Sequence, residues 1–489
     1  MHALLAIVLF LAPSPEGCLN CHNGIENIHP AKALTCTECH GGNPRAATKE
    51  EAHVRPAKPL VNDERTLPLD YDLPYLRFEN PSNLRVVDES CGDCHPNEIE
   101  ALRKSLHGTT SGHLSDGLYE NGVTAARTSA VAIFKTGALP QIPAFHAKAE
   151  KKGAPPSLAE HYTDLERKAC MQCHLWSRGR AVRGRLGMDG DYRSEGCAAC
   201  HTLYANDGLS RSGDPTVNKL EPGHPVKHEM TSKVPVDQCV HCHYGDASIG
   251  LNFRGLAQLV PGMPAGPDIA GTTKSRLNGS FYLQDPAVNP PDIHFERGMA
   301  CIDCHTFGDI MGRGGETPTK MEGAVEIECT DCHGDFQKRA TLTTQRGTKL
   351  EHIRIENGRY ILRGKVDGKD HVVPQVVDVL TPGSAHYDVN AIAAMTPVHQ
   401  KLECYACHSG WSPNFFGFHF DRNEQFTQLE VLSGERTPGR VSTQEKVFGT
   451  FRNLLLGWSP EGTVSPYLVG FSTMGTVHAK DGKKIIDQG

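Results

Sequence analysis

The cysteines of this chain fall into pairs that all have the same spacing. All 18 belong to nine C-x-x-C pairs, and a histidine follows the second cysteine of every pair. Thiolate and imidazole bind metals, and thiols also form covalent links, so each triplet could hold a cofactor. The pairs are Cys18/Cys21, Cys36/Cys39, Cys91/Cys94, Cys170/Cys173, Cys197/Cys200, Cys239/Cys242, Cys301/Cys304, Cys329/Cys332 and Cys404/Cys407. The histidines are His22, His40, His95, His174, His201, His243, His305, His333 and His408.

Three kinds of chemistry compete for this motif. A disulfide framework suits an exported chain, but it gives no reason for a histidine after every second cysteine. Zinc sites use C-x-x-C pairs, but they need ligands in fours rather than nine identical triplets. C-x-x-C-H is the attachment signature of c-type haem, in which two thioethers hold the porphyrin and the adjacent histidine binds the iron. Because only 26 of 489 residues are histidine, nine matches in nine pairs are no coincidence, and we predict nine covalent haem c groups.

The other histidines could supply the second axial ligand of each iron. Sixteen remain once the motif histidines and His2 are set aside, whereas the chain has only ten methionines. A methionine ligand raises the reduction potential relative to a second histidine, so we expect mainly bis-histidine haems of low potential. The haem to which each distal ligand belongs is left open. The candidate distal ligands are His29, His53, His107, His146, His161, His224, His228, His294 and His399.

Composition indicates how such a chain would fold. Apolar residues make up 38% and aromatic residues 7%, while 49 glycines and 32 prolines favour loops. Nine flat apolar porphyrins would supply the missing core, because the hydrophobic gain follows the apolar area removed from water. We therefore predict a multihaem cytochrome fold that is mostly irregular, with short α-helices wrapped around stacked haems. The chain without haem is predicted not to fold.

The chain divides into three predicted regions. Residues 1–14 include ten apolar residues, too few to span a bilayer but typical of the core of a signal peptide. Residues 15–335 form a haem-rich region with eight motifs, and residues 336–489 form a C-terminal region with one motif. In that last region, β-hairpins are predicted at Asn357-Gly358, Asp367-Gly368 and Asp481-Gly482. The protein is therefore expected to be exported, to the periplasm or to an extracellular or outer-membrane location, with no transmembrane span.

Motif spacing predicts which haems are neighbours. The first cysteines of three motif pairs are separated by short gaps, so their haems are expected to lie close together. These pairs begin at Cys18 and Cys36, at Cys170 and Cys197, and at Cys301 and Cys329.

Several stretches resemble a known family. "CGDCHPNEIEALRKSLHG" and "CLNCHNGIENIHP…CTECHGGNP…AHV" are similar to multihaem c-type cytochromes, particularly the cytochrome c554-like and octahaem group, over most of residues 17–420. In such relatives the equivalent of Cys404–His408 is commonly followed by another C-x-x-C-H. Here that frame reads Phe415-Phe416-Gly417-Phe418-His419. It is either a degenerate tenth haem site or an ordinary aromatic loop.

The expected function is electron transfer through a chain of nine haems, with no catalytic residue. The partners would be other cytochromes or a quinol-oxidising membrane complex, and the chain could form a homo- or hetero-oligomer. The alternative, which the resemblance implies, is a multihaem oxidoreductase of nitrite, hydroxylamine or tetrathionate type with one open-site haem. A net charge of −7 without a strong basic block argues against a nucleic-acid partner.

Overall fold

The computed structural model describes the greater part of the chain. The predicted signal peptide, 1–14, lies outside the described residues, as do Cys170, Cys173 and His146. The described residues are 17–29, 32–59, 71–120, 124–125, 128, 130–134, 139–144, 158–168, 174–176, 192–205, 207–243, 250, 253–255, 257–258, 273–277, 280–284, 290–314, 321–395, 399–408, 415–430, 432–433, 435–445, 455–467 and 470–488.

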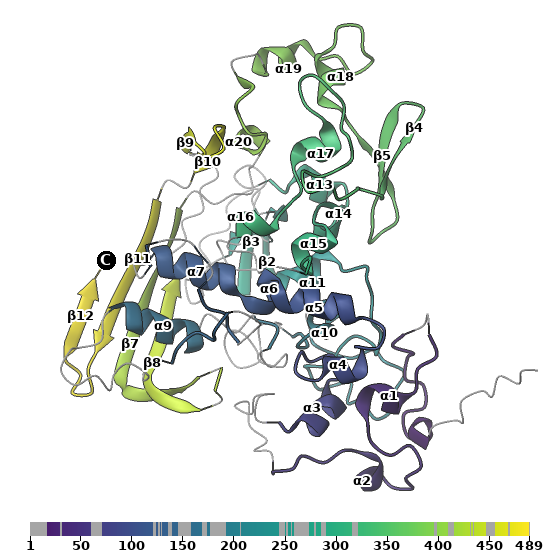
Figure 1. The fold of residues 1–489 in the computed structure, drawn as a ribbon, viewed down its shortest axis with the longest axis vertical. Coiled ribbons are helices and arrows are strands. Elements are labelled where there is room, and N and C mark those ends of the chain that lie inside the picture. The colour runs from purple at the N-terminus through teal and green to yellow at the C-terminus, as the bar shows by residue number, and fades with distance from the viewer. Residues whose placement is uncertain are drawn as a thin grey trace, which may run out of the picture.

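Short helices that carry the cysteine motifs succeed one another along the long axis of the molecule (Figure 1). In Figure 1 they rise from α1 near the bottom, past α4, α10, α11, α14 and α17, to α20 near the top. The elements that contain or adjoin motifs are η1 (Gly17–Asn20), α1 (Cys36–His40), α4 (Val87–Ser90), α10 (Ala198–His201), α11 (Val236–Val240), α14 (Cys301–Cys304), α17 (Cys329–His333) and α20 (Tyr405–His408).

Local sequence explains where three of these helices begin. In α1, α14 and α17 the residue before the second cysteine is acidic, and its carboxylate accepts a hydrogen bond from the backbone N–H just before the first cysteine. The distances are 2.6 Å for Glu38, 2.7 Å for Asp303 and 2.8 Å for Asp331. Such a contact satisfies a backbone donor that the first helical turn leaves without an intrahelical partner. The x-x positions of these motifs therefore help to fold the motif.

The remaining helices are short and connect or cover the motifs. The stretch after His95 breaks at Ser105, whose hydroxyl accepts from the Gly108 N–H and donates to the Leu102 carbonyl. This break starts a new helix one residue before His107. These helices are α2 (Lys49–Ala52), α3 (Leu73–Glu79), α5 (Pro96–Lys104), α6 (Leu106–Thr109), α7 (Ser111–Glu120), α9 (Leu158–Lys168), α13 (Ile293–Glu296), α15 (Phe307–Ile310), α16 (Met321–Ala324), α18 (Val376–Leu380) and α19 (Val389–Ala394).

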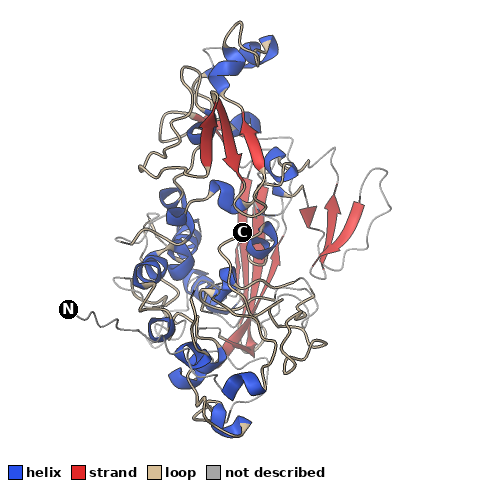
Figure 2. Ribbon diagram, turned by 90° about the vertical axis from the view of Figure 1, so that its right-hand side faces the viewer, coloured by secondary structure: helices blue, strands red, loops and turns tan. Residues whose placement is uncertain are grey.

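Three small sheets accompany one larger sheet (Figure 2). The strands β4 (Ile353–Glu356), β5 (Arg359–Arg363) and β6 (Asp370–Val373) form an antiparallel meander, and its turns fall at the two Asx-Gly pairs expected there. The turn between β11 and β12 likewise contains Asp481-Gly482. The other strands are β1 (Ala257–Gln258), β2 (Thr273–Leu277), β3 (Ser280–Gln284), β7 (Phe415–Leu429), β8 (Arg436–Glu445), β9 (Leu455–Trp458), β10 (Val464–Tyr467), β11 (Gly470–His478) and β12 (Lys484–Gln488).

The segment 415–419 differs from both interpretations of it. It is neither a loop nor a helical turn, but the start of β7, which pairs in parallel with β11 from Phe415↔Gly470 onward. Positions three apart lie on one side of a helical turn but on opposite faces of a strand. The frame therefore does not have the backbone geometry that the nine motifs share.

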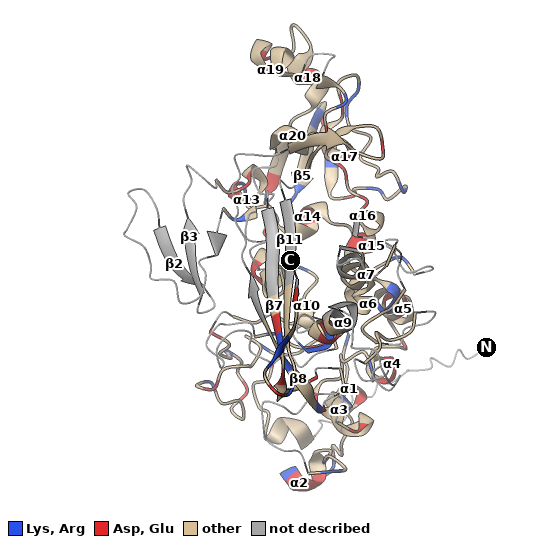
Figure 3. Ribbon diagram, turned by 90° about the vertical axis from the view of Figure 1, so that its left-hand side faces the viewer, with Lys and Arg blue, Asp and Glu red and all other residues tan. Residues whose placement is uncertain are grey.

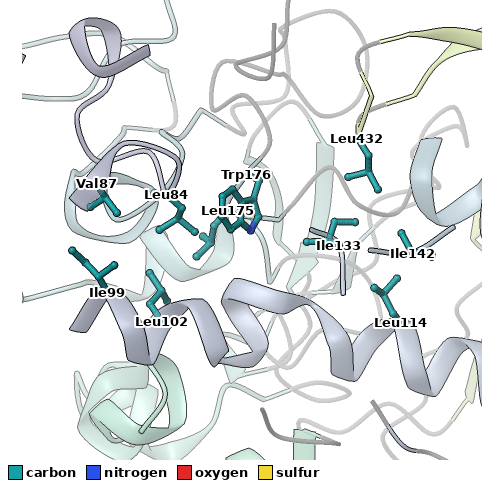
Figure 4. Close-up of a cluster of buried hydrophobic side chains, with 11 residues drawn as sticks. Leu84, Val87, Ile99, Leu102, Leu114, Ile133, Ile142, Leu175, Trp176 and Leu432 are labelled. Atoms are coloured by element: carbon teal, nitrogen blue, oxygen red, sulfur yellow. The ribbon is translucent and has the colours of Figure 1, made fainter. Parts of the chain in front are cut away.

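Two small hydrophobic clusters lie among the described residues. One includes Leu102, Trp176 and Ala199, with Cys91 and Cys197 packed against it (Figure 4). The other forms under the β4–β6 meander. The chain as a whole, including the segments outside the described ranges, exposes 27693 Å². A compact monomer of 53.3 kDa exposes about 18,000 Å², so the polypeptide does not close a core of its own.

A buried ion cluster joins α9 to the four-stranded sheet, beside which charges of both signs appear in Figure 3. The carboxylate of Asp164 accepts from Lys168 Nζ at 2.9 Å and from Arg422 Nε at 2.8 Å. Arg167 also pairs with Glu430. These contacts link the predicted haem-rich region directly to the predicted C-terminal region.

Candidate metal centres

Each motif whose backbone is described is built on a helical turn. In six of them the histidine N–H donates to the carbonyl of the first cysteine, as from His22 to Cys18 at 2.9 Å and from His305 to Cys301 at 2.9 Å. Two further motifs are themselves the helices α1 and α17. One turn therefore gathers two thiols and an imidazole within a five-residue segment.

Five motif histidines each face a histidine from outside the motifs. The ring centroids are 6.0 to 6.3 Å apart in every pair, while the interplanar angles range from 30° to 83°. Each outside histidine belongs to the set expected as distal ligands. The pairs are His22/His53, His95/His29, His40/His228, His243/His107 and His333/His294.

This separation suits two ligands of one metal ion. A metal–imidazole bond is about 2 Å long and the nitrogen lies about 1 Å from the ring centre, so imidazoles on opposite sides of a metal have centroids about 6 Å apart. Ordinary aromatic pairs also span this range. The recurrence therefore carries the interpretation: one motif histidine with one outside histidine, five times among the described residues.

Hydrogen bonds fix the orientation of these rings. Nδ1 of His40 donates to the Phe78 carbonyl at 2.7 Å, and Nδ1 of His228 donates to the Glu26 carbonyl at 3.0 Å. The other ring nitrogen, Nε2, is then available to a metal. A histidine that binds metal usually donates its second N–H in this way. Nδ1 is bonded similarly in His22 to Asp214, His107 to the Ile310 carbonyl, His294 to Asp292 and His333 to the Pro374 carbonyl.

Burial keeps several of these rings in the state that binds metal. Burial is the main cause that lowers the pKa of His40, His53, His107 and His333. A lowered pKa leaves the imidazole neutral at neutral pH, and the neutral ring is the ligand.

The ligands come in twos. Among the described residues, no group of three or more His, Cys, Asp or Glu side chains is arranged to hold a metal ion. Two imidazoles fill the axial positions of a haem iron, because the porphyrin supplies the other ligands. The paired thiols of each motif are the groups that would form the thioethers. The residues therefore fit haem c.

Thiols from different motifs also approach one another. The Cys239 and Cys301 thiols lie within hydrogen-bonding reach, and so do the Cys329 and Cys404 thiols. Cys91 and Cys197 pack against the same cluster, and Cys304 and Cys332 pack against the other. Cys239 also interacts with Cys200. These contacts link the third, fifth, sixth, seventh, eighth and ninth motifs in that order.

Three second cysteines disagree with the expectation that haem and its tethers form the packing centre. Cys21 and Cys94 are exposed, and Cys242 is only half-buried. In two of these motifs the first cysteine makes the contact, because Cys91 packs against the cluster of Figure 4 and Cys239 approaches the seventh motif. The second thiol lies three residues further along the turn, at the edge of that contact. The polypeptide therefore does not enclose these three thiols, and their role as thioether tethers stays a prediction.

The other predicted ligands lie in varied settings. His161 is fully buried in α9, beside β7 and β8. His399 Nδ1 donates to the Ala394 carbonyl at 2.6 Å, as a ligand would. His224 lies on the 207–233 segment, where its N–H donates to the Gly208 carbonyl. Of the other motif histidines, His201 donates from Nδ1 to the Thr231 carbonyl, and His305 lies 3.4 Å from Asp309. His174 is buried and His408 ends α20. Assignment of these ligands to individual haems stays a prediction.

Sequence reasoning missed the partners of the imidazoles. Asp292 could have been found from the sequence, because it lies two residues before His294 and caps the same helix. Asp214 could not, because it is 192 residues from His22. The chain matches no protein-family model, no curated protein and no solved structure. Within the described residues, no helix is both long and apolar enough to cross a bilayer.

Proposed function

We propose that this protein is an exported multihaem c-type cytochrome that carries electrons through nine covalently bound haems, mainly with two axial histidines. The observation that carries the proposal is the five histidine pairs, each joining a motif histidine to one from outside the motifs. When bound, haem iron supplies a one-electron couple. The chain's own residues tether it, ligate it and set its surroundings.

The succession of motifs supports conduction along the molecule. The motif-bearing helices follow one another from α1 to α20 along the long axis (Figure 1). Cysteine contacts join the third, fifth, sixth, seventh, eighth and ninth motifs into one series. The two N-terminal sites join the series through His29, which faces His95 of the third motif. Haems held at these places would be near neighbours, as stepwise electron transfer requires.

Two measurements on the purified, exported protein test this function. Intact-mass spectrometry should find nine covalent haems, and EPR of the oxidised protein should be dominated by low-spin signals. Replacing Cys404 and Cys407 together with serine should remove one covalent haem and leave eight. A protein without a Soret band, or one that binds zinc through its thiols, would overturn the proposal. A large high-spin signal that nitrite or hydroxylamine changes would favour the oxidoreductase alternative instead.

A further inference from the structure

The histidine pairs differ in what accepts the Nδ1 proton. In the His40/His228 pair both acceptors are backbone carbonyls. His22 instead donates to the Asp214 carboxylate at 2.8 Å, and His294 donates to the Asp292 carboxylate at 2.8 Å. The first and the eighth sites therefore each have an acidic partner that the second site lacks.

Asp214 is held firmly against His22. Its side chain is only 3% exposed. Its Oδ1 accepts from the backbone N–H of Thr216 at 2.8 Å and from the Thr216 hydroxyl at 2.9 Å, which leaves Oδ2 for the imidazole. The Lys219 ammonium lies on the backbone carbonyl of Asp214 at 2.7 Å and offsets part of the negative field.

Asp292 is built into the segment it serves. It caps α13, and its Oδ1 accepts both the backbone N–H and the Nδ1–H of His294, each at 2.8 Å. The side chain is 9% exposed. The other acidic contacts are weaker. Asp309 lies 3.4 Å from His305 and also near Arg313, while Glu98 lies 3.9 Å from His95 at the surface.

A carboxylate acceptor changes the ligand that it orients. It takes a larger share of the Nδ1 proton than a carbonyl does, so the imidazole becomes a stronger donor through Nε2. A fixed negative charge near the iron also favours the ferric state, and burial limits its screening by water and salt. Both effects lower a reduction potential. Hydrogen bonding to a ligand is one of the ways in which a protein adjusts a haem.

We propose that Asp214 and Asp292 are positioning residues that hold the His22/His53 and His294/His333 sites at lower reduction potentials than the His40/His228 site. This inference rests on the proposed function. The two acidic sites lie toward opposite ends of the motif series, near α1 and at α17 (Figure 1). The potential along the series is therefore uneven, with low-potential sites toward both ends.

Asp214→Asn and Asp292→Asn, each in the full haem-loaded protein, test the inference. Asparagine keeps an acceptor oxygen but removes the charge. In each variant the midpoint potential of one haem should rise in a spectroelectrochemical titration, while the other eight stay in place. Asp214→Glu, which keeps the charge, should stay close to the parent. Asp88→Asn is the matched control, because Asp88 pairs with Arg103 at the surface and contacts no motif histidine.

The outcomes separate the two proposals. Haem content by mass spectrometry and low-spin EPR signals are recorded for every variant, so that loss of a ligand is not mistaken for a shift in potential. Nine low-spin haems with unchanged potentials in both Asn variants would overturn the inference and leave the proposed function intact. A parent protein without covalent haem would instead overturn the proposed function itself. If Asp214→Asn does not assemble, Asp292→Asn decides the question.

Discussion

The imidazoles of His40 and His228 lie face to face, with ring centroids 6.0 Å apart, although His40 belongs to the second motif and His228 lies between the fifth and sixth. Both rings are fixed by backbone carbonyls, those of Phe78 and Glu26. The second site is therefore completed by three segments that are far apart in the sequence. This arrangement makes the contribution of each segment separately testable.

Replacing His228 with alanine should leave one haem with a single protein ligand. We expect the covalent haem number to stay at nine, because attachment depends on Cys36 and Cys39. One haem should change from low-spin to high-spin, and EPR of the oxidised protein would detect the change. His386→Ala is the control, because His386 is exposed and faces no motif histidine. A wholly low-spin His228→Ala variant would show that His228 is not the ligand.

The chain made without haem attachment should not fold. Its exposed area is far above that of a compact protein of its mass, and its two described clusters contain only eleven and seven buried residues. Circular dichroism should therefore show no cooperative thermal transition, and trypsin should digest the apoprotein much faster than the holoprotein. A cooperative transition in the apoprotein would contradict the predicted role of haem as core.

Asp164→Asn should destabilise the contact between α9 and the four-stranded sheet. The substitution leaves the buried cations Lys168 and Arg422 without their shared carboxylate, and such a loss costs about 3–5 kcal/mol. Denaturant unfolding of the holoprotein measures the change in free energy. Asp207→Asn removes an exposed partner of Arg211 and should cost less than about 1 kcal/mol. Equal effects of the two substitutions would mean that the buried cluster contributes no more than a surface pair.

Glu326 should make stability depend on pH in the acid range. Burial raises its pKa, but hydrogen bonds from Thr306, Arg313, Thr348 and Thr344 outweigh burial and lower the pKa to about 2. A lowered folded-state pKa contributes stability above the unfolded value of about 4.5, and this contribution is lost as pH falls toward 2.

Glu326→Gln should therefore destabilise the protein at pH 7 by about 2–3 kcal/mol, and the difference should shrink between pH 4.5 and 2. Unfolding curves of the parent and the variant across this range give the comparison. Glu356→Gln is the control, because Glu356 pairs with Arg354 on the exposed face of the meander. A constant difference at all pH values would indicate lost packing rather than lost charge.

The sequence predicted local features better than long-range ones. The turns at Asn357-Gly358 and Asp481-Gly482 and the helical character of the motif segments depend on neighbouring residues, so spacing was enough. The sheet of β2 and β3 was missed, although Asn278-Gly279 between its strands is the same hairpin signal. The 415–419 segment was misjudged because its motif-like frame hid a strand that pairs with β11, a partner more than fifty residues away.

Neighbouring motifs show the same limit. A short gap correctly indicated that the motifs of Cys304 and Cys332 lie together, because a short connection cannot separate them far. The contact of Cys329 with Cys404 spans a long gap that includes the β4–β6 meander. The path of that meander depends on tertiary packing, which spacing does not report. Distal histidines could be proposed as a set for the same reason, but could not be assigned to individual sites.

The 207–233 segment supplies His228 to the second site and Asp214 to the first, and its Ser212 and Gly213 bond Glu26 near the N-terminus. The first two sites therefore cannot be cut out as a minimal two-haem module, because an N-terminal fragment would lack an axial ligand and a carboxylate partner. During synthesis, too, the first haems attached would wait, half-ligated and open to small molecules, until the ribosome had passed the middle of the gene. Correct assembly thus depends on how long the growing polypeptide is protected before that clasp arrives.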